Sequence, residues 1–231
     1  MARVTMASET SDQQGVPPAE AKDWPRPRSA WYAVGMISFI SVLSNIDRGV
    51  IALLVEPIKR DLQVSDTEMG LLIGFAFSFF YMLVGLPMSR VTDVRNRRNI
   101  LTIGLSIWSM ATALSALAYS YLTLFIARGI VGAGESVKGP TSMSMISDIV
   151  PRSKLPRAMS IYSMGIAGGM AASMIIGGVL LELVKDITPI HVPGFGLLRD
   201  WQFVFLSCGL PGLLVAVIFF LTVKEPTRKG R

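Results

Sequence analysis

The chain has 231 residues, of which 51% are hydrophobic and only 16% are charged, and its formal net charge is +6. Soluble domains carry about a quarter charged residues, so this composition excludes an ordinary soluble domain. The basic residues lie mostly between long apolar runs, which makes their excess a signal of membrane topology and not of nucleic-acid binding. A single cysteine excludes a disulfide within the chain.

Six apolar stretches divide the sequence, each long enough to cross the hydrocarbon core of a bilayer, about 30 Å thick, as a helix. Residues 1–28 are polar, which predicts a disordered cytoplasmic tail. We expect residues 29–223 to form one all-α membrane bundle of six transmembrane helices, and residues 224–231 to begin a central cytoplasmic linker. The predicted spans are Ala30–Val55, Met69–Met88, Ile100–Ala118, Tyr121–Ile146, Ala158–Val184 and Trp201–Val223.

The distribution of Lys and Arg predicts the orientation of these spans. Fifteen of the 22 basic residues lie in the tail, the second and fourth connections and the C-terminal segment, whereas four lie in the other connections. Because cytoplasmic segments retain positive charge, both termini are expected on the cytoplasmic side of the inner (plasma) membrane. The remaining three, Arg48, Arg128 and Lys138, lie within predicted spans.

The first span contains two adjacent charges, Asp47 and Arg48, in an otherwise apolar run. A charged side chain at bilayer depth costs about 2.5–3.5 kcal/mol even on the lenient insertion scale. Both residues therefore need partners elsewhere in the bundle. The connection that follows contains the sequence SDTE, in which Ser65 and Glu68 have the spacing of a helix-capping box.

The second connection, SRVTDVRNRRNIL at residues 89–101, carries four arginines. Retention of positive charge on the cytoplasmic side would by itself account for them. The segment also resembles the loop 2–3 signature of the major facilitator superfamily, G-x-L-A-D-R-x-G-R-R-x-x-L, with Asp93, Arg97 and Arg98 at its acidic and basic positions. Asn96 replaces the second glycine of the signature, and asparagine tolerates a left-handed backbone better than most residues.

The fourth span carries a second match to the same superfamily. LFIARGIVGAGES, at residues 124–136, resembles the helix-four signature L-x-x-x-R-x-x-Q-G-x-G, and SDIVPRSKLPRA, which follows, resembles the loop 4–5 pattern. That pattern implies an ion pair between Asp148 and Arg97, so that Asp93, Arg97, Arg98 and Asp148 would form a gating motif.

A narrower resemblance involves both halves of the sequence. NIDRGVIALLVEP in the first span and GAGESVKGP in the fourth are similar to the Spinster-like branch, whose first helix carries an Asp-Arg pair and whose fourth carries G-x-G-E. The resemblance implies the N-terminal six-helix half of a transporter. It also implies export of a small amphipathic or anionic solute, such as a lysolipid or a sphingoid phosphate, coupled to protons.

The charges within the spans are expected to form one network. Arg128 and Glu135 are seven residues apart and so lie on one face of the fourth helix, which a compact bundle brings beside the first. We predict a cavity network of Asp47, Arg48, Arg128 and Glu135 in which Asp47 pairs with Arg128 and exchanges a proton as the pair opens. A guanidinium would suit a phosphate group. The alternative is a static packing network, in which Lys138 pairs locally with Glu135.

Small residues and proline predict where helices bend or approach closely. Gly139–Pro140 predicts a kink in the fourth span, because proline removes a backbone donor. Gly70 and Gly74 in the second span, and Gly165 and Gly169 in the fifth, have the four-residue spacing of close helix contacts. In the fifth span these glycines fit either a rocking interface between transporter halves or ordinary packing.

Transporters of this superfamily bind substrate between two six-helix halves, so a missing C-terminal half or a second six-helix chain would complete this one. The other expected partners are a small-molecule substrate, protons and the lipid bilayer, and not nucleic acid. No cofactor, metal site or enzymatic activity is predicted, because the sequence has no spaced Cys/His set, phosphate loop or nucleophile elbow. The alternatives are an organic-anion or sugar-acid transporter of another branch, an intramembrane enzyme, and a truncated membrane scaffold that does not transport.

Overall fold

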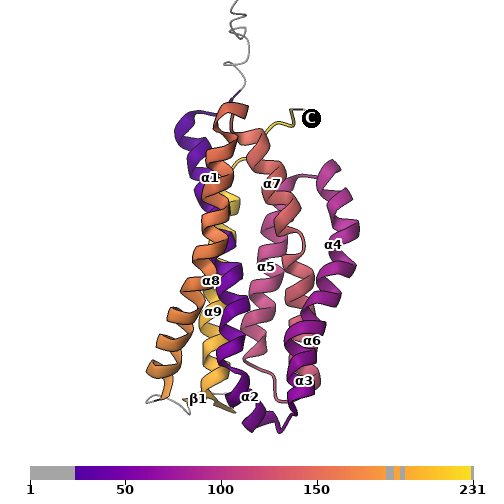
Figure 1. Cartoon of the computed structure of the whole chain (residues 1–231), viewed down its shortest axis with the longest axis vertical. Helices are drawn as coiled ribbons and strands as arrows, with labels where there is room; N and C mark the ends of the chain where they lie inside the picture. The colour runs from indigo at the N-terminus through magenta and orange to yellow at the C-terminus, as the bar shows by residue number, and fades with distance from the viewer. Residues whose placement is uncertain (1–23, 186–189, 193–195, 230–231) are drawn as a thin grey trace, which may run out of the picture.

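The computed structural model describes residues 24–185, 190–192 and 196–229, so most of the predicted tail lies outside the described residues. The described chain is an elongated bundle of helices (Figure 1). Its elements are α1 (Pro27–Leu53), α2 (Val55–Leu62), α3 (Asp66–Gly70), the π-helix η2 (Leu71–Ala76), α4 (Phe77–Val94), α5 (Arg97–Ser115), α6 (Tyr121–Glu135), α7 (Lys138–Ile149), the 3₁₀ turn η3 (Arg152–Lys154), α8 (Leu155–Lys185), β1 (Ile190–Val192), β2 (Gly196–Leu198) and α9 (Asp200–Thr222).

The six predicted spans correspond to these helices in order. The first, third, fifth and sixth are α1, α5, α8 and α9; the second is α3, η2 and α4 in succession, and the fourth is α6 with α7. Four helical stretches in the described residues are long and apolar enough to cross a membrane. They are Pro27–Leu53, Asp66–Val94, Arg152–Val184 and Asp200–Thr222.

The predicted third and fourth spans are not among these four stretches, because of their composition and length. Helix α5 begins with two arginines, and α6 and α7 have 15 and 12 residues. The fourth span breaks at Ser136–Val137, directly before Gly139–Pro140. Proline has no N–H, and its ring crowds the carbonyl four residues earlier, here that of Ser136. The predicted interruption of this helix is therefore confirmed.

Two connections show how local chemistry starts helices. The Ser65 hydroxyl accepts from the backbone N–H of Glu68, whose carboxylate accepts from the N–H of Ser65, so the predicted capping box is confirmed. The left-handed conformation considered for Asn96 is wrong. Asn96 is extended (φ −64°, ψ 113°) and is the N-cap of α5, because its side chain accepts from the N–H of Asn99.

The end of the bundle opposite the described termini carries two further features. Helix α2 is tied to the start of α9, since Trp201 Nε1 donates to Asp61 Oδ2 at 2.5 Å. Between α8 and α9, strands β1 and β2 pair antiparallel, with Ile190 opposite Leu198. The sequence predicts only a connection between the fifth and sixth spans here.

The glycines of α8 face α1. A Cβ at Gly165 would meet the carbonyl of Ser38, and one at Gly169 would meet that of Val42. These glycines therefore permit close packing within the bundle, which supports ordinary packing over an interface between halves. The spacing of Gly70 and Gly74 permits a close approach, but a Cβ at either would meet no atom of the described residues within 4 Å.

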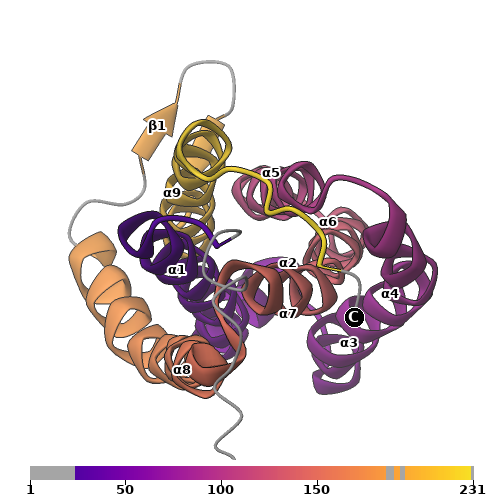
Figure 2. The same ribbon diagram turned by 90° about the horizontal axis from the view of Figure 1, so that it is seen from above.

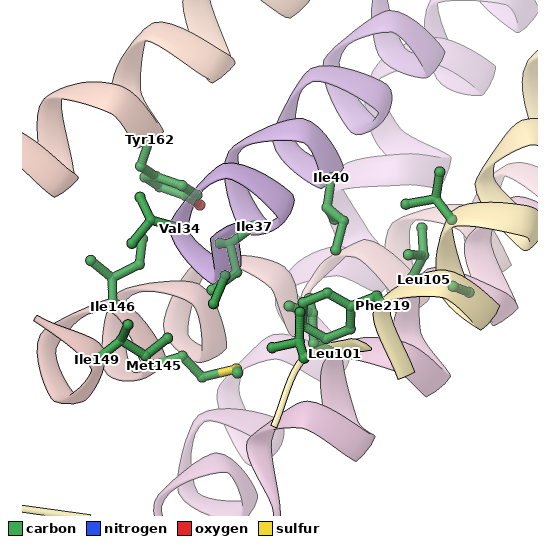
Figure 3. Close-up of a cluster of buried hydrophobic side chains, with 14 of the residues drawn as sticks. Val34, Ile37, Ile40, Leu101, Leu105, Met145, Ile146, Ile149, Tyr162 and Phe219 are labelled. Atoms are coloured by element: carbon green, nitrogen blue, oxygen red, sulfur yellow. The ribbon is translucent and has the colours of Figure 1, made fainter. Parts of the chain in front are cut away.

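Two apolar clusters fill the interior, and polar residues lie between them. The first joins α1, α5, α7, α8 and α9 near the described termini (Figure 3). The second joins α1 to α2, η2 and α9 at the other end. On α1 the first cluster ends at Ile40 and the second begins at Ile46, and Ser41, Ser44 and Asn45 are buried in the interval. The charged residues of the spans lie at or near this level.

The outside of the bundle is apolar. Seen from above, α5 and α9 lie side by side, while α8 and α4 lie on opposite sides (Figure 2). Both α4 and α8 expose large apolar side chains, such as Met82 and Leu86 on α4 and Met164 and Ile175 on α8. Contiguous exposed apolar surface of this kind is unstable in water and suits the hydrocarbon core of a bilayer.

Candidate functional site

An ion pair within the predicted spans joins Arg48 of α1 to Glu135, the last residue of α6. Arg48 Nη2 lies 2.6 Å and Nε 2.7 Å from the same carboxylate oxygen, Oε2 of Glu135. The Glu135 side chain is fully buried, whereas that of Arg48 is 38% exposed. The Arg48 guanidinium also lies over the rings of Phe77 and Tyr81 at the start of α4. One face of this guanidinium is therefore held by aromatic rings and one edge by a carboxylate.

Ser44 connects this ion pair to a second cation. Its hydroxyl donates to Glu135 Oε2 at 2.7 Å and accepts from Lys138 Nζ at 2.6 Å. Ser44 and Lys138 are both buried. Lys138 is the first residue of α7, so the break in the fourth span lies between Glu135 and Lys138. The local Glu135–Lys138 pair that the sequence left open is replaced by a contact through Ser44.

Asp47 is buried on the same helix and points to another neighbour. The hydroxyl of Thr112, on α5, donates to Asp47 Oδ2 at 2.7 Å, and Oδ1 has no hydrogen-bond partner in the described residues. A buried carboxylate with one oxygen unsatisfied is costly to maintain as an anion.

Arg128 is also buried, on α6. Its guanidinium lies 4.4 Å from the ring centre of Phe205 on α9, and its Nε and Nη2 have no hydrogen-bond partner within the described part of the chain. The charges of Arg128 and Asp47 interact electrostatically, but the described residues contain no ion pair between them. The predicted Asp47–Arg128 ion pair is thus not formed in this conformation: Asp47 accepts from Thr112, and Arg128 lies over the ring of Phe205.

The structure nevertheless brings all four predicted residues into one region, in which Asp47, Arg128 and Glu135 are buried and Arg48 is partly exposed. We call it the intramembrane cluster, comprising Ser44, Asp47, Arg48, Thr112, Arg128, Glu135 and Lys138. Its contacts join α1 to α5, α6 and α7. Arg128 and Glu135 are both buried, as their spacing of seven predicts.

A second charged site lies at the end of the bundle where the described termini lie. Arg97 Nη1 lies 2.6 Å from Asp148 Oδ2, so the pair implied by the loop signatures is confirmed. Arg97 is 1% exposed, and its other nitrogens reach the segment after α9: Nε donates to Glu225 Oε1 at 3.0 Å and Nη2 to the carbonyl of Pro226 at 2.9 Å. Arg97 therefore joins α5, α7 and the C-terminal segment.

The other two residues of the predicted gating motif have smaller roles here. Asp93 is exposed on the last turn of α4 and forms no ion pair in the described residues. The backbone N–H of Arg98 donates to Glu225 Oε2 at 2.7 Å, while its guanidinium lies over the ring of Phe220. Arg228 donates to the carbonyls of Thr92 and Arg95. The segment after α9 is therefore hydrogen-bonded to the loop that carries this motif.

Sequence reasoning missed Ser44, Thr112, Phe205 and Glu225. Ser44 and Thr112 are small polar residues inside apolar spans, and Ser44 lies one helical turn before Asp47 and Arg48, which is a usable signal. Phe205 is one of many aromatic residues in the spans, and nothing in its spacing distinguishes it. Glu225 follows the last apolar residue, where an acidic side chain near an arginine-rich loop indicates a pair.

The fold and both charged sites define a class of protein, and comparison with known proteins agrees. The family model described as Major Facilitator Superfamily matches residues 37–231. The chain belongs to this superfamily and forms an all-α membrane bundle, the N-terminal six-helix half of its fold. It is accordingly a multi-pass membrane protein.

Similar proteins include Spinster proteins and other transporters of the superfamily. A crystal structure of a bacterial homolog of the human lysosomal transporter Spinster, inward-facing and unoccupied, is 32% identical with a TM-score of 0.80, covering 88% of this chain and 45% of that one. An MFS-type efflux pump of Mycolicibacterium smegmatis is 27% identical over 85% of this chain and 42% of its own length. A sphingosine-1-phosphate transporter of Danio rerio is 27% identical over 88% and 38%. The chain thus resembles the Spinster-like branch and spans less than half the length of these relatives.

Proposed function

We propose that this chain is the N-terminal half of a proton-coupled secondary transporter in the inner (plasma) membrane, with both termini cytoplasmic. A C-terminal half or a second six-helix chain would complete it. The solute is small and amphipathic or anionic, such as a lysolipid. The observation that carries the proposal is the buried intramembrane cluster, because ionisable side chains are retained within spans chiefly where they bind ions, protons or substrate.

Proton coupling is assigned to Asp47 and Arg128. Asp47 holds one hydrogen bond from Thr112 and has one unsatisfied oxygen, while Arg128 keeps two nitrogens without partners in the described residues. Each side chain thus has unused hydrogen-bonding capacity, and the two charges interact electrostatically. A rocking motion that brought them into contact would favour the ionised carboxylate, and a motion that separated them would favour its protonation.

Substrate contact is assigned to Arg48 and Glu135. Arg48 is the partly exposed member of the cluster, and its guanidinium can bind phosphate or carboxylate through two parallel hydrogen bonds. The sphingosine-1-phosphate transporter among the relatives makes a lysolipid phosphate the first candidate. The gating motif, Asp93, Arg97, Arg98 and Asp148, would hold the cytoplasmic end closed or open.

A second candidate substrate class is supported by one comparison. A probable anion transporter from the chloroplast of Arabidopsis thaliana is 26% identical over 97% of this chain and 40% of its own length. An organic anion would use the same guanidinium of Arg48 without an acyl chain. Competition between a lysolipid and a short organic acid for uptake distinguishes the two classes.

The proposal is tested with the complete transporter in liposomes under an imposed pH gradient. We expect Asp47→Asn and Arg128→Ala each to reduce proton-driven lysolipid flux to the level of protein-free liposomes, with folding retained by size-exclusion profile. Asp66→Asn is the matched control, because Asp66 is an exposed acid paired with Lys59 outside the cluster. Full pH-driven flux in Asp47→Asn would contradict the proton-coupling assignment, and a chemically altered solute would point to an enzyme instead.

The same assay addresses the half-transporter. This chain alone in liposomes should give no solute uptake, because alternating access needs two bundles that rock about a site between them. Uptake by the 231-residue chain alone would refute the need for a second half.

A further inference from the structure

We infer that Lys138 is a reserve counter-ion for Glu135, which frees Arg48 to bind the anionic group of the solute. The inference rests on the proposed transport function and names the residue that sets its preference for an anion. Three facts carry it: two cations share one carboxylate, only one of those cations is exposed, and a single hydroxyl connects the other to the carboxylate.

The first fact is the crowding of one carboxylate oxygen. Glu135 Oε2 accepts from Arg48 Nε, Arg48 Nη2 and the Ser44 hydroxyl, whereas Oε1 has no hydrogen-bond partner in the described residues. Half of the carboxylate is therefore unused while Arg48 is bound. A second cation could be accepted there without displacing the first hydrogen bonds.

The second fact is the balance of charge. Arg48 and Lys138 face one carboxylate, that of Glu135, and the neighbouring Asp47 and Arg128 offset each other, so the ionised cluster carries one excess positive charge in the described residues. Buried charges are normally paired. A cluster with one surplus cation is complementary to one negative group from outside the chain.

The third fact is the difference in exposure. Arg48 is 38% exposed at its side chain, whereas Lys138 is buried and reaches Glu135 only through Ser44. An arriving anion can contact Arg48 and not Lys138. If Arg48 turned toward that anion, Glu135 would be left as an unpaired buried carboxylate, which is strongly unfavourable.

Lys138 removes that penalty. Its ammonium is one hydrogen bond from Ser44 and two from Glu135, so a small rotation of its flexible stem brings it to the carboxylate. Arg48 then carries an unneutralised charge and binds the anion with a planar fork. Because Glu135 ends α6 and Lys138 begins α7, this exchange of partners spans the break in the fourth helix, and solute binding would change the contact between its two segments.

The solute class that follows is an amphipathic molecule with one anionic head, a phosphate monoester or a carboxylate. A neutral head of similar size would not draw Arg48 away from Glu135. Octyl phosphate and octyl glucoside, which share an alkyl chain, separate these cases.

The test measures binding of both probes to the complete transporter in nanodiscs by calorimetry, with empty nanodiscs subtracted. We expect Lys138→Met to weaken octyl phosphate binding about tenfold or more, the effect of losing one charge-assisted contact, and to leave octyl glucoside binding unchanged. Lys138→Arg should stay within about threefold of the unaltered protein. Lys154→Met is the matched control, because Lys154 is an exposed lysine in η3.

Ser44→Ala keeps every charge and removes only the connecting hydroxyl, so it remains informative if Lys138→Met does not fold. Weaker octyl phosphate binding in Ser44→Ala is expected, and unchanged binding in either folded variant would overturn the inference. The proposed function has a separate outcome: lysolipid flux by the unaltered transporter with no effect of Lys138→Met rejects only the inference. Absence of both flux and octyl phosphate binding rejects the function itself.

Discussion

Arg97 shows how one residue can hold three parts of a membrane protein together. All of its nitrogens donate hydrogen bonds, to Asp148, to Ser144 and to the segment after α9. Because the side chain is nearly fully buried, these bonds are shielded from water and are stronger than surface pairs. The residue that sequence reasoning assigned to gating is therefore also structural in this conformation.

Replacement of Arg97 should be far more damaging than replacement of its neighbour. Arg97→Gln leaves Asp148 and Glu225 without their charged partner, and breaking a buried pair costs about 3–5 kcal/mol. We expect the lower end of that range, since Glu225 is partly exposed. Arg98→Gln should cost less than about 1 kcal/mol, because within the described residues its guanidinium contacts Asn99 and the Phe220 ring and no acid. Melting temperatures in detergent check the difference, and equal losses would contradict it.

The charged residues of the intramembrane cluster could be predicted from sequence, but their pairing could not. Asp47 and Arg48 are adjacent and so point about 100° apart around α1. Which neighbour lies in each direction depends on the packing order of the helices: Asp47 meets Thr112 on α5, and Arg48 meets Glu135 on α6. By contrast, the Arg97–Asp148 pair was predictable, because two signature loops on the same side of the membrane specified both partners.

Helices α1 and α8 approach each other closely along a face of α8 that carries glycines. Gly165 and Gly169 lie one turn apart with main-chain carbonyls of α1 opposite them, while Gly168 faces open space. Small residues at such positions let backbones approach and gain van der Waals contact in lipid, where no hydrophobic effect draws helices together.

The adjacent glycines of α8 provide a matched test. Gly169→Ala places a methyl group against the Val42 carbonyl, and because backbone cannot move aside cheaply, we expect a loss of about 1–3 kcal/mol. Gly168→Ala meets no atom, so it should be neutral or stabilising by up to about 1 kcal/mol through helix propensity. Thermal unfolding of the two variants checks this, and a destabilised Gly168→Ala would show that the face is occupied.

Helix existence was predictable at this scale, since each span is an apolar run of membrane length. Which face of each helix packs against a neighbouring helix was harder to predict. Gly70 and Gly74 have the same spacing as Gly165 and Gly169, yet of these four only the two in α8 face a neighbouring helix. Spacing shows that a close contact is permitted, whereas the packing order of the bundle decides whether another helix is present to make it.

The whole molecule has an apolar exterior, a polar layer near its middle and the charged Arg97 site at the end where the described termini lie. This site includes the start of the predicted linker, because Glu225 and Arg228 form hydrogen bonds with residues in and beside the loop between α4 and α5. Movement of that loop would therefore be transmitted to the chain that follows α9. The side of the membrane on which the Arg97 site lies is predicted by the distribution of Lys and Arg along the chain, and by no single motif.

That side can be tested with two introduced cysteines. In a Cys208→Ser background, Thr67→Cys places a thiol on the first turn of α3 and Ser153→Cys places one in η3, both at exposed positions. Since fifteen basic residues lie on the η3 side against four on the other, the positive-inside rule places η3 in the cytoplasm. A membrane-impermeant maleimide should label Thr67→Cys in intact cells and Ser153→Cys only after the membrane is opened. The reverse pattern would invert the topology and, with it, the direction in which the proposed transporter couples protons to solute.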